Sequence, residues 1–199
     1  MLIGLIGKKQ SGKDTVAHYL GVKYDYQQYS LAEPMKLACR HIFLMSDNQL
    51  WGDQKEVVDM RYNTTPRKIL QIIGTELFQY DIYRHIPEMK GGVPPRELWI
   101  NRFKLWFNRQ IDPNLPIQQR VKTNVVVSDV RFPHEAKAIK ELGGMLIKIY
   151  RPSEGNVIDG HASEQEMDGI TFDYMIMNDR TIRELHIEVD KLTGDLRGR

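Results

Sequence analysis

The sequence predicts a three-layer α/β fold, in which a central parallel β-sheet is covered by helices on both faces. Short apolar runs at residues 2–6, 124–129 and 145–150 alternate with stretches whose apolar residues recur at helical spacing. Strands that are apolar throughout, rather than at every second residue, are typical of parallel sheets buried on both faces. The first run ends in a glycine-bounded loop that leads directly into a helix, as expected for alternating strands and helices.

The first quarter of the chain is expected to supply two strands and two helices. Residues 2–6 form the first strand, and the helix after the loop carries Val16, Ala17 and Leu20 at helical spacing. Residues 29–32 are expected to form a second short strand. Pro34 suits the first turn of the next helix. The expected buried stripe of that helix is Met35, Ala38, Ile42 and Met45.

The middle of the chain is predicted to be helical. Thr65 followed by Pro66 marks a helix start, because the hydroxyl caps free N–H groups and proline needs no partner there. The expected buried stripe of this helix is Ile69, Leu70, Ile73 and Leu77. Residues 87–97 are rich in glycine and proline and form a loop. Residues 98–109 follow as a helix that carries Trp99, Phe103 and Trp106.

The last third is expected to complete the sheet. The strand at residues 124–129 leads to a helix at 133–142, which Gly143 and Gly144 end. Strands at 145–150 and 174–177 follow. Asn178 or Asp179 is expected to cap a final helix with Ile182, Leu185, Val189 and Leu192 facing inward. We therefore predict one domain over residues 1–199, with a core at about 1–45 and 123–199 and a helical excursion at about 46–122.

Composition and charge exclude several classes of protein. The 199 residues are 41% apolar and contain one cysteine, Cys39, so we expect no internal disulfide and a cytoplasmic location. No apolar run reaches the ~18 residues of a membrane span, and the first run is too short for a signal-peptide core. The net charge of +2 argues against stable nucleic-acid binding as the main role. Residues 83–122 nevertheless hold eight basic and three acidic residues.

A phosphate-binding motif lies between the first strand and the first helix. Gly7-x-x-x-x-Gly12-Lys13 has the P-loop spacing, in which glycines let backbone N–H groups point at phosphate oxygens and the lysine reaches the β- and γ-phosphates. The alternative is a glycine-rich turn without a ligand. The expected nucleotide-binding residues are Gly7, Lys9, Gln10, Ser11, Gly12, Lys13, Asp14 and Thr15.

The motif departs from the usual pattern after the lysine. Asp14 stands where Ser or Thr commonly binds Mg²⁺, and Thr15 comes one residue later. A carboxylate among phosphates is costly unless it binds a cation or a proton. We therefore expect Asp14 to contact Mg²⁺ or to orient the attacking oxygen, and Thr15 to bind the α-phosphate or the metal. The alternative for Asp14 is a helix-start acid stabilised by the helix dipole.

Further candidate residues lie at the end of a strand and on helix faces. Asp129 ends the strand at 124–129, where parallel sheets bind ligands, and suits a metal-bound water or a substrate hydroxyl. Arg131 adds a cation to the same loop; the alternative for both is a surface ion pair. Arg67, Gln71 and Thr75 share a helix face, and Arg67 suits a phosphate monoester, unless this face is merely solvated. Weaker candidates for phosphate binding are Lys36 and Arg61. His161 and Glu164, three apart on a glycine-rich loop, are expected to contact a nucleotide base or, alternatively, to form a structural hydrogen bond.

Together these segments resemble the deoxynucleoside monophosphate kinases of bacteriophages, within the P-loop kinase superfamily. The resemblance is carried, in family order, by residues 7–15 (GKKQSGKDT), 32–36 (AEPMK), 65–76 (TPRKILQIIGTE), 128–136 (SDVRFPHEA) and 161–164 (HASE). The phosphate loop indicates only a nucleotide, whereas its combination with the segment at 128–136 is more specific. The aspartate after the lysine is itself part of the family pattern.

The resemblance implies a P-loop NTPase fold with a helical lid and monophosphate-binding region. It also implies ATP- and Mg²⁺-dependent phosphorylation of a deoxynucleoside 5′-monophosphate, in the host cytoplasm if the chain is viral. Lys13, Asp14 and Thr15 would serve ATP and metal, with Asp129 as a further metal ligand. The acceptor would be bound by Lys36, Arg67, Gln71, Asp129, Arg131 and Glu164. Members of the family tend to be homodimers.

Phosphoryl transfer to a phosphate needs little general-base help, so catalysis is expected to rest on positioning and charge neutralisation. Arg131 and Arg102 are the expected catalytic cations beside Lys13 and Asp14, and Arg102 and Arg109, on one helix face, are the first choices in the basic excursion. A solvated helix face is the alternative for both arginines of the excursion. Competing functions are another P-loop kinase, of the phosphomevalonate or dephospho-coenzyme A type, and a non-catalytic nucleotide- or nucleic-acid-binding module.

Overall fold

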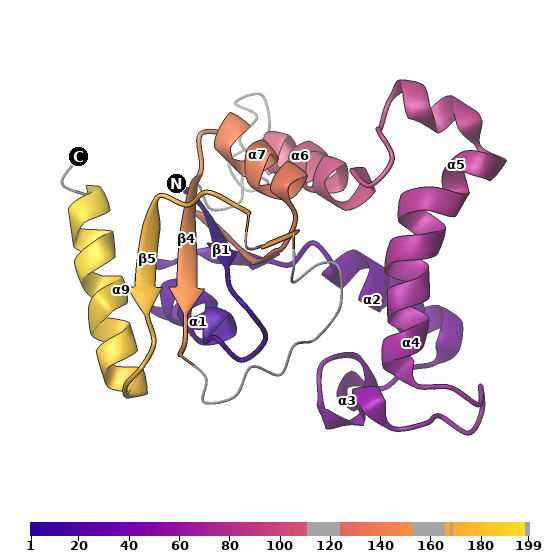
Figure 1. Ribbon diagram of the computed structural model, residues 1–199, viewed down its shortest axis with the longest axis horizontal. Helices are drawn as coiled ribbons and strands as arrows, with labels where there is room; N and C mark the ends of the chain where they lie inside the picture. The colour runs from indigo at the N-terminus through magenta and orange to yellow at the C-terminus, as the bar shows by residue number, and fades with distance from the viewer. Residues whose placement is uncertain (111–123, 153–165, 168, 198–199) are drawn as a thin grey trace. The chain divides into compact units, whose positions relative to one another are not determined.

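A parallel five-stranded sheet forms the centre of one of the two compact units of the protein (Figure 1). The computed structural model describes residues 1–110, 124–152, 166–167 and 169–197. Residues 1–30 and 104–199 form the unit with the sheet, which we call the sheet unit. Residues 31–103 form the other, which we call the helical unit.

The strands of the sheet are parallel throughout, as predicted. They are β1 (Leu2–Ile6), β2 (Gln27–Tyr29), β3 (Val125–Val130), β4 (Met145–Tyr150) and β5 (Tyr174–Met177). Their order is β2-β3-β1-β4-β5, so β1 lies in the middle and its C-terminal end is flanked by the ends of β3 and β4. The second strand begins and ends earlier than the expected 29–32, because Ser30 leaves the ladder and donates its hydroxyl to Asp129.

A β-bulge interrupts the pairing of β1 with β3. Gly4 pairs with Val127, whereas Ile6 pairs with Val130, so β3 contains one residue more than β1 over this stretch. The extra residue falls among the last residues of β3, where Asp129 is found. Bulges of this kind redirect side chains near binding sites.

Helices cover both faces of the sheet. Helices α1 (Lys13–Tyr24) and α9 (Ile182–Arg197) pack against one face, where Leu5, Ile147 and Val189 belong to a shared buried core. Helix α7 (Pro133–Glu141) packs on the other face, where Gly4 lies against Ile139. The predicted three layers are therefore confirmed.

Helix α9 starts later than expected. Thr181 caps it: the Thr181 hydroxyl accepts the Glu184 N–H (3.3 Å), and the Glu184 carboxylate accepts the Thr181 N–H (3.0 Å). The expectation that Asn178 or Asp179 would be the cap was wrong, because the Asn178 side chain donates to the Ser11 carbonyl instead and Thr181 occupies the capping position. Leu185 and Val189 face inward as predicted, but Ile182 is 65% exposed.

The helical unit contains a long irregular helix. The segments α4 (Pro66–Gln71), η2 (Ile72–Asp81) and α5 (Ile82–His85) follow one another without a break (Figure 1), and η2 is a π-helix. Thr65 caps α4 as predicted, with its hydroxyl accepting the Lys68 N–H (3.3 Å). The remaining helices of this unit are α2 (Glu33–Phe43), α3 (Asp47–Leu50), η1 (Asp53–Glu56), η3 (Pro87–Gly91) and the start of α6 (Leu98–Gln110).

Two of the predicted stripes in this unit were partly wrong. In α2, Met35 is buried with Cys39, while Ala38 and Ile42 are exposed, so the buried face is rotated from the expected one. Leu70 is buried as predicted, but Leu77 is 41% exposed. The wider turns of the π-helix remove Leu77 from the stripe that regular helical spacing predicts.

The boundary between the two units falls within α6, at residues 103 and 104. The expected excursion at residues 46–122 overlaps the helical unit, and its residues 111–122 lie outside the described part of the chain. None of the helices in the described ranges combines the length and apolarity that crossing a bilayer requires.

Candidate active site

The loop between β1 and α1, residues 7–13, has the shape of a phosphate-binding loop, and we call it the phosphate loop. Gln10 and Gly12 both have left-handed backbone angles, with φ of 64° and 102°. The Ser11 N–H donates to the Lys8 carbonyl (3.1 Å), which closes the turn. Gly12 stands at the N-terminus of α1 with no side-chain cap, so the helix start can receive an anion.

Lys13 lies back along the phosphate loop. Its ammonium group donates to the carbonyl oxygens of Gly7 and Lys8, the second at 2.8 Å. The Lys13 ammonium group thus lies beside the backbone of the loop, where it can donate to an oxygen of a bound phosphate.

Asn178, directly after the edge strand β5, fixes the phosphate loop from two strands away, because β4 lies between β5 and β1. Its Nδ2 donates to the Ser11 carbonyl oxygen (2.9 Å), and its backbone N–H donates to the Tyr150 carbonyl (2.7 Å). A Cβ at position 12 would lie 2.5 Å from Asn178 Nδ2 and would prevent this contact. Glycine is therefore required at position 12 for two reasons, the close approach of Asn178 and the left-handed φ angle. The sequence pattern predicts only a helix cap at Asn178, and this role depends on a contact with a distant segment.

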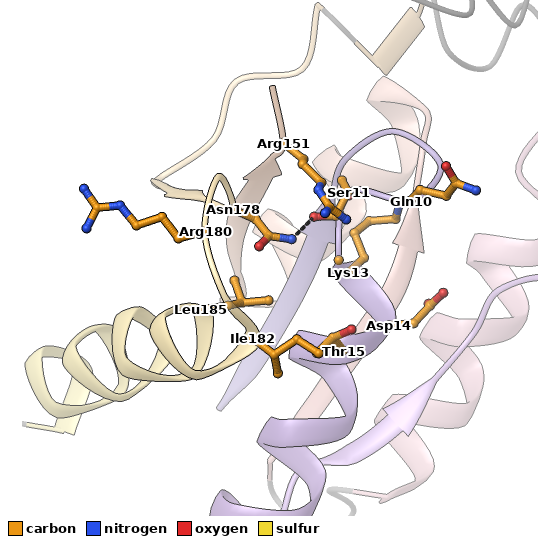
Figure 2. Close-up of a pocket in the computed structure, with 11 residues that line it drawn as sticks. Gln10, Ser11, Lys13, Asp14, Thr15, Arg151, Asn178, Arg180, Ile182 and Leu185 are labelled. Atoms are coloured by element: carbon orange, nitrogen blue, oxygen red, sulfur yellow. Dashed lines mark hydrogen bonds between the residues drawn. The ribbon is translucent and has the colours of Figure 1, made fainter. Parts of the chain in front are cut away.

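A cavity of about 330 Å³ lies between the phosphate loop and the start of α9 (Figure 2). Residues 10–15 form one side of it, and Arg151, Asn178, Arg180, Ile182 and Leu185 form the other. Arg151 points toward Ser11, whereas Arg180 points away from the loop (Figure 2). These two arginines were not among the predicted site residues, although each follows the end of a strand.

The residues of this loop fit a phosphate group and a magnesium ion. The Ser11 hydroxyl is buried with no hydrogen-bond partner among the described residues. Asp14 is exposed in the first turn of α1, and Thr15 is partly buried beside it. The described ranges contain no group of three or more His, Cys, Asp or Glu residues placed to hold a metal. Mg²⁺ commonly takes one or two carboxylates plus substrate phosphates, and Asp14 and Thr15, at the edge of the cavity, offer a carboxylate and a hydroxyl oxygen.

Asp129 lies in β3, the neighbour of β1, near the same edge of the sheet as the phosphate loop. Its Oδ2 accepts the Ser30 hydroxyl (2.7 Å), and the residue is partly buried. This places Asp129 at the sheet edge expected for a ligand-facing carboxylate.

The Arg131 side chain is exposed, while its backbone is held by a buried carboxylate that the sequence analysis did not single out. Glu135, 6% exposed in the first turn of α7, accepts the N–H groups of Arg131 (2.8 Å) and Phe132 (3.1 Å). Burial, with a further contribution from the charge of Asp129, raises the pKa of Glu135 to about 8, although both N–H groups favour the charged form. The sequence does contain a signal for this contact, because a glutamate at the third position of a helix commonly accepts the backbone N–H of the residue that precedes the helix.

The other predicted residues lie in the helical unit, on the part of α6 that belongs to the sheet unit, and in the undescribed ranges. Arg67 pairs with Glu56, and Gln71 is exposed on the same helix. Lys36 and Arg40 lie over the ring of Trp51, at 5.7 Å and 5.0 Å from its centre. Arg102 and Arg109 are exposed on α6. His161 and Glu164 lie outside the described residues.

Arg61, the weakest candidate for phosphate binding, forms an ion pair with Asp59. The Asp59 carboxylate is almost fully buried and accepts hydrogen bonds from the Arg61 guanidinium, as well as one from the Gln49 amide (2.8 Å). The bonds from Arg61 are the main reason that the pKa of Asp59 lies well below its usual range. Arg61 therefore holds the loop around Asp59.

Comparison with known proteins points in one direction. A family model described as "Deoxynucleotide monophosphate kinase" matches residues 1–64 and 45–189. A protein of Acanthamoeba polyphaga mimivirus, described as "Putative deoxynucleotide monophosphate kinase", is 39% identical over 193 residues, which are 95% of this chain and 94% of that protein.

Solved structures of small-molecule kinases are similar at lower identity. Shikimate kinase from Aquifex aeolicus vf5 has 18% identity and a TM-score of 0.49, with all of both chains covered. Dephospho-CoA kinase from Campylobacter jejuni has 16% identity and a TM-score of 0.45, with 98% of this chain and 96% of that chain covered.

The environment of Glu135 predicts a specific pH dependence of stability. Its pKa is about 8 in the folded protein against 4.5 in a model compound. The folded state thus binds this proton more tightly, so the group contributes stability below its unfolded pKa that is lost as the pH rises toward 8. Relative to Glu135→Gln, which keeps the accepting oxygen, the wild type should lose unfolding free energy between about pH 5 and about pH 8.

Chemical denaturation of both proteins across this range measures the difference. Glu188→Gln, a change at an exposed carboxylate of α9, is the matched control and should follow the wild type. A Glu135→Gln profile parallel to that of the wild type would contradict the buried, proton-binding environment.

Proposed function

The chain belongs to the deoxynucleotide monophosphate kinase family, and from this premise we propose that it transfers the γ-phosphoryl group of ATP to the 5′-phosphate of a deoxynucleoside monophosphate. The family is one of phosphotransferases, and its reaction implies the use of ATP. The observation that carries the proposal is the phosphate loop, with Lys13 along it and Asn178 holding its backbone, in a chain that matches the family over nearly its whole length.

We assign the donor nucleotide to the phosphate loop and its cavity. The phosphate groups would be bound by Gly7, Lys9, Gln10, Ser11, Gly12 and Lys13, with Thr15 at the α-phosphate or the metal. Arg151 points toward the loop and adds a cation. The exposed side chain of Ile182 offers an apolar surface to the nucleoside part of the ligand.

Asp14, Thr15 and Asp129 are the residues that we expect to hold Mg²⁺. A magnesium ion held there would supply positive charge to neutralise the nucleotide phosphates. The side chains contribute oxygen atoms from two elements, the start of α1 and the end of β3, both near the carboxyl edge of the sheet.

We assign binding of the acceptor to Lys36, Arg67, Gln71, Asp129, Arg131 and Glu164, the residues that the resemblance to the family implies. An oxygen of the acceptor phosphate forms a bond to the γ-phosphorus as the bond from that phosphorus to the bridging oxygen of ADP breaks. The acceptor phosphate is already anionic, so positioning and charge neutralisation by Lys13, Arg131 and Arg102 carry the rate.

The location and assembly of the enzyme follow from the same proposal. ATP and deoxynucleoside monophosphates are intracellular, so we place the enzyme in the cytoplasm, of an infected host if the chain is viral. We also propose that the enzyme is a homodimer. Light scattering on the purified protein should then give twice the mass of one chain. A monomer at all concentrations would overturn the homodimer without affecting the reaction.

The reaction is tested with purified enzyme, ATP and Mg²⁺. We expect ADP release with at least one of dTMP, dGMP and 5-hydroxymethyl-dCMP, and none with mevalonate phosphate or dephospho-coenzyme A. Lys13→Met should lower kcat by about 100-fold or more, because a charge that stabilises the transition state is lost. Lys191→Met, the same change at an exposed position on α9, should leave kcat unchanged. Activity confined to a substrate that is not a nucleoside monophosphate would contradict the proposal.

The proposed catalytic role of the arginines in the basic stretch at residues 83–122 is tested by Arg102→Ala and Arg109→Ala. If these arginines neutralise charge on the transferred group, kcat should fall by more than about tenfold in at least one variant. Arg183→Ala, on the exposed face of α9, is the matched control. If both variants stay within about threefold of the wild type, under ~1 kcal/mol of barrier, these arginines have no such role.

A further inference from the structure

Trp51 presents an aromatic ring to solvent in the helical unit. The residue is 41% exposed. Trp99, the other tryptophan of this unit, instead packs against the buried cluster that includes Met35, Cys39 and Leu70. A ring that meets water in this way has apolar surface that a flat ligand can cover. Trp51 is therefore a candidate for contact with an aromatic ligand.

The backbone that carries Trp51 is well held. Trp51 directly follows α3, whose start is closed by a capping box: the Ser46 N–H donates to the Gln49 amide oxygen (2.9 Å), and the Gln49 N–H donates to the Ser46 hydroxyl (3.3 Å). At the other end of α3, the Trp51 N–H donates to the Asp47 carbonyl (2.7 Å). The ring thus stands on an ordered turn, which lowers the entropy cost of binding a ligand there.

Two cations of α2 hold the indole ring from one side. The Lys36 ammonium nitrogen and the Arg40 guanidinium carbon lie 5.7 Å and 5.0 Å from the ring centre, within the range of cation–π contacts. Lys36 and Arg40 are at positions i and i+4 of α2 and so share one face of that helix. Because both approach from α2, the side of the ring that faces away from α2 is the side that a ligand can reach.

Two of the residues that we assign to the acceptor are linked to Trp51. Lys36 contacts its ring directly. Arg67 pairs with Glu56 in η1, which begins two residues after Trp51. The Glu56 side chain is 58% exposed, and an ion pair in water contributes little, so an acceptor phosphate can replace Glu56 as the partner of Arg67. The ring therefore belongs to the same group of helices as two cations that suit a phosphate.

We propose that Trp51 stacks on the base of the acceptor nucleotide. This inference rests on the proposed function, which supplies that nucleotide. Stacking uses the π-face that every base has and reads none of its hydrogen-bonding groups. Trp51 would therefore retain deoxynucleoside monophosphates with purine and with pyrimidine bases, and it would discriminate against phosphate esters that lack an aromatic ring.

Binding measurements with and without a base test this role. Calorimetry would compare the wild type with Trp51→Leu for dGMP, dTMP and deoxyribose 5-phosphate, which has the sugar and the phosphate but no base. We expect Trp51→Leu to weaken both nucleotides by about tenfold, a loss typical of one base stacked on an aromatic ring, and to leave deoxyribose 5-phosphate within about twofold. Trp51→Phe should keep both nucleotides within about threefold, because it keeps an aromatic ring.

The controls separate stacking from a general effect on the helical unit. Tyr80→Leu, a similar change at a 39% exposed aromatic residue of η2, should bind all ligands like the wild type. Bound dGMP should also quench tryptophan fluorescence of the wild type, and this quenching should be largely lost in Trp51→Phe, although that variant still binds. Thermal unfolding establishes that each variant is folded, and Trp51→Met replaces Trp51→Leu if the latter is not.

The possible failures are distinguishable. If Trp51→Leu binds dGMP and dTMP within about twofold of the wild type, or loses deoxyribose 5-phosphate to the same extent as the nucleotides, stacking by Trp51 is overturned, even where the wild type phosphorylates these nucleotides. A loss confined to ATP overturns it as well, because it assigns Trp51 to the donor. If the wild type binds dGMP and dTMP but transfers no phosphoryl group to them, the proposed function fails, while the loss in Trp51→Leu still identifies the base-binding residue.

Discussion

The hydrogen bond from Asn178 Nδ2 to the Ser11 carbonyl is the contact on which the candidate site depends. It joins residues 167 positions apart in the sequence and ties the phosphate loop to the end of β5. The bond is buried, so the Ser11 carbonyl would have no water to replace it. Gly12 makes the approach possible because it lacks a Cβ and adopts a left-handed backbone. The shape of the loop is therefore set by the whole sheet and not by the loop sequence alone.

The carboxyl edge of the sheet also explains why the other site residues meet. Because β1 lies between β3 and β4, the phosphate loop begins beside Val130 on one side and Lys148 on the other. The β3 end brings Asp129 and a loop whose backbone is held by Glu135. The β4 end brings Arg151. The net charge of +2 thus conceals a concentration of cations around the phosphate loop in addition to that in residues 83–122.

Sequence patterns predicted the parts of this structure that depend on local chemistry. Apolar runs located β1, β3, β4 and β5, and the glycine spacing located the phosphate loop. What they missed depends on contacts between distant segments. Asn178 could not be distinguished from a helix cap without knowing that Ser11 lies beside it, and Glu135 became notable only through its burial. The π-helix after Gln71 could not be predicted from the sequence, because the periodicity of apolar residues was interpreted with regular α-helical spacing.

The measurement that tests this account most directly is the affinity of Asn178→Ala for ATP. Alanine keeps the backbone N–H that donates to Tyr150 and removes only the side-chain bond to Ser11. Calorimetry should show ATP binding weakened by about tenfold, as expected when a buried carbonyl loses its partner, with the affinity for the monophosphate acceptor unchanged. An ATP affinity equal to that of the wild type, in a folded variant, would contradict the claim that Asn178 shapes the phosphate loop.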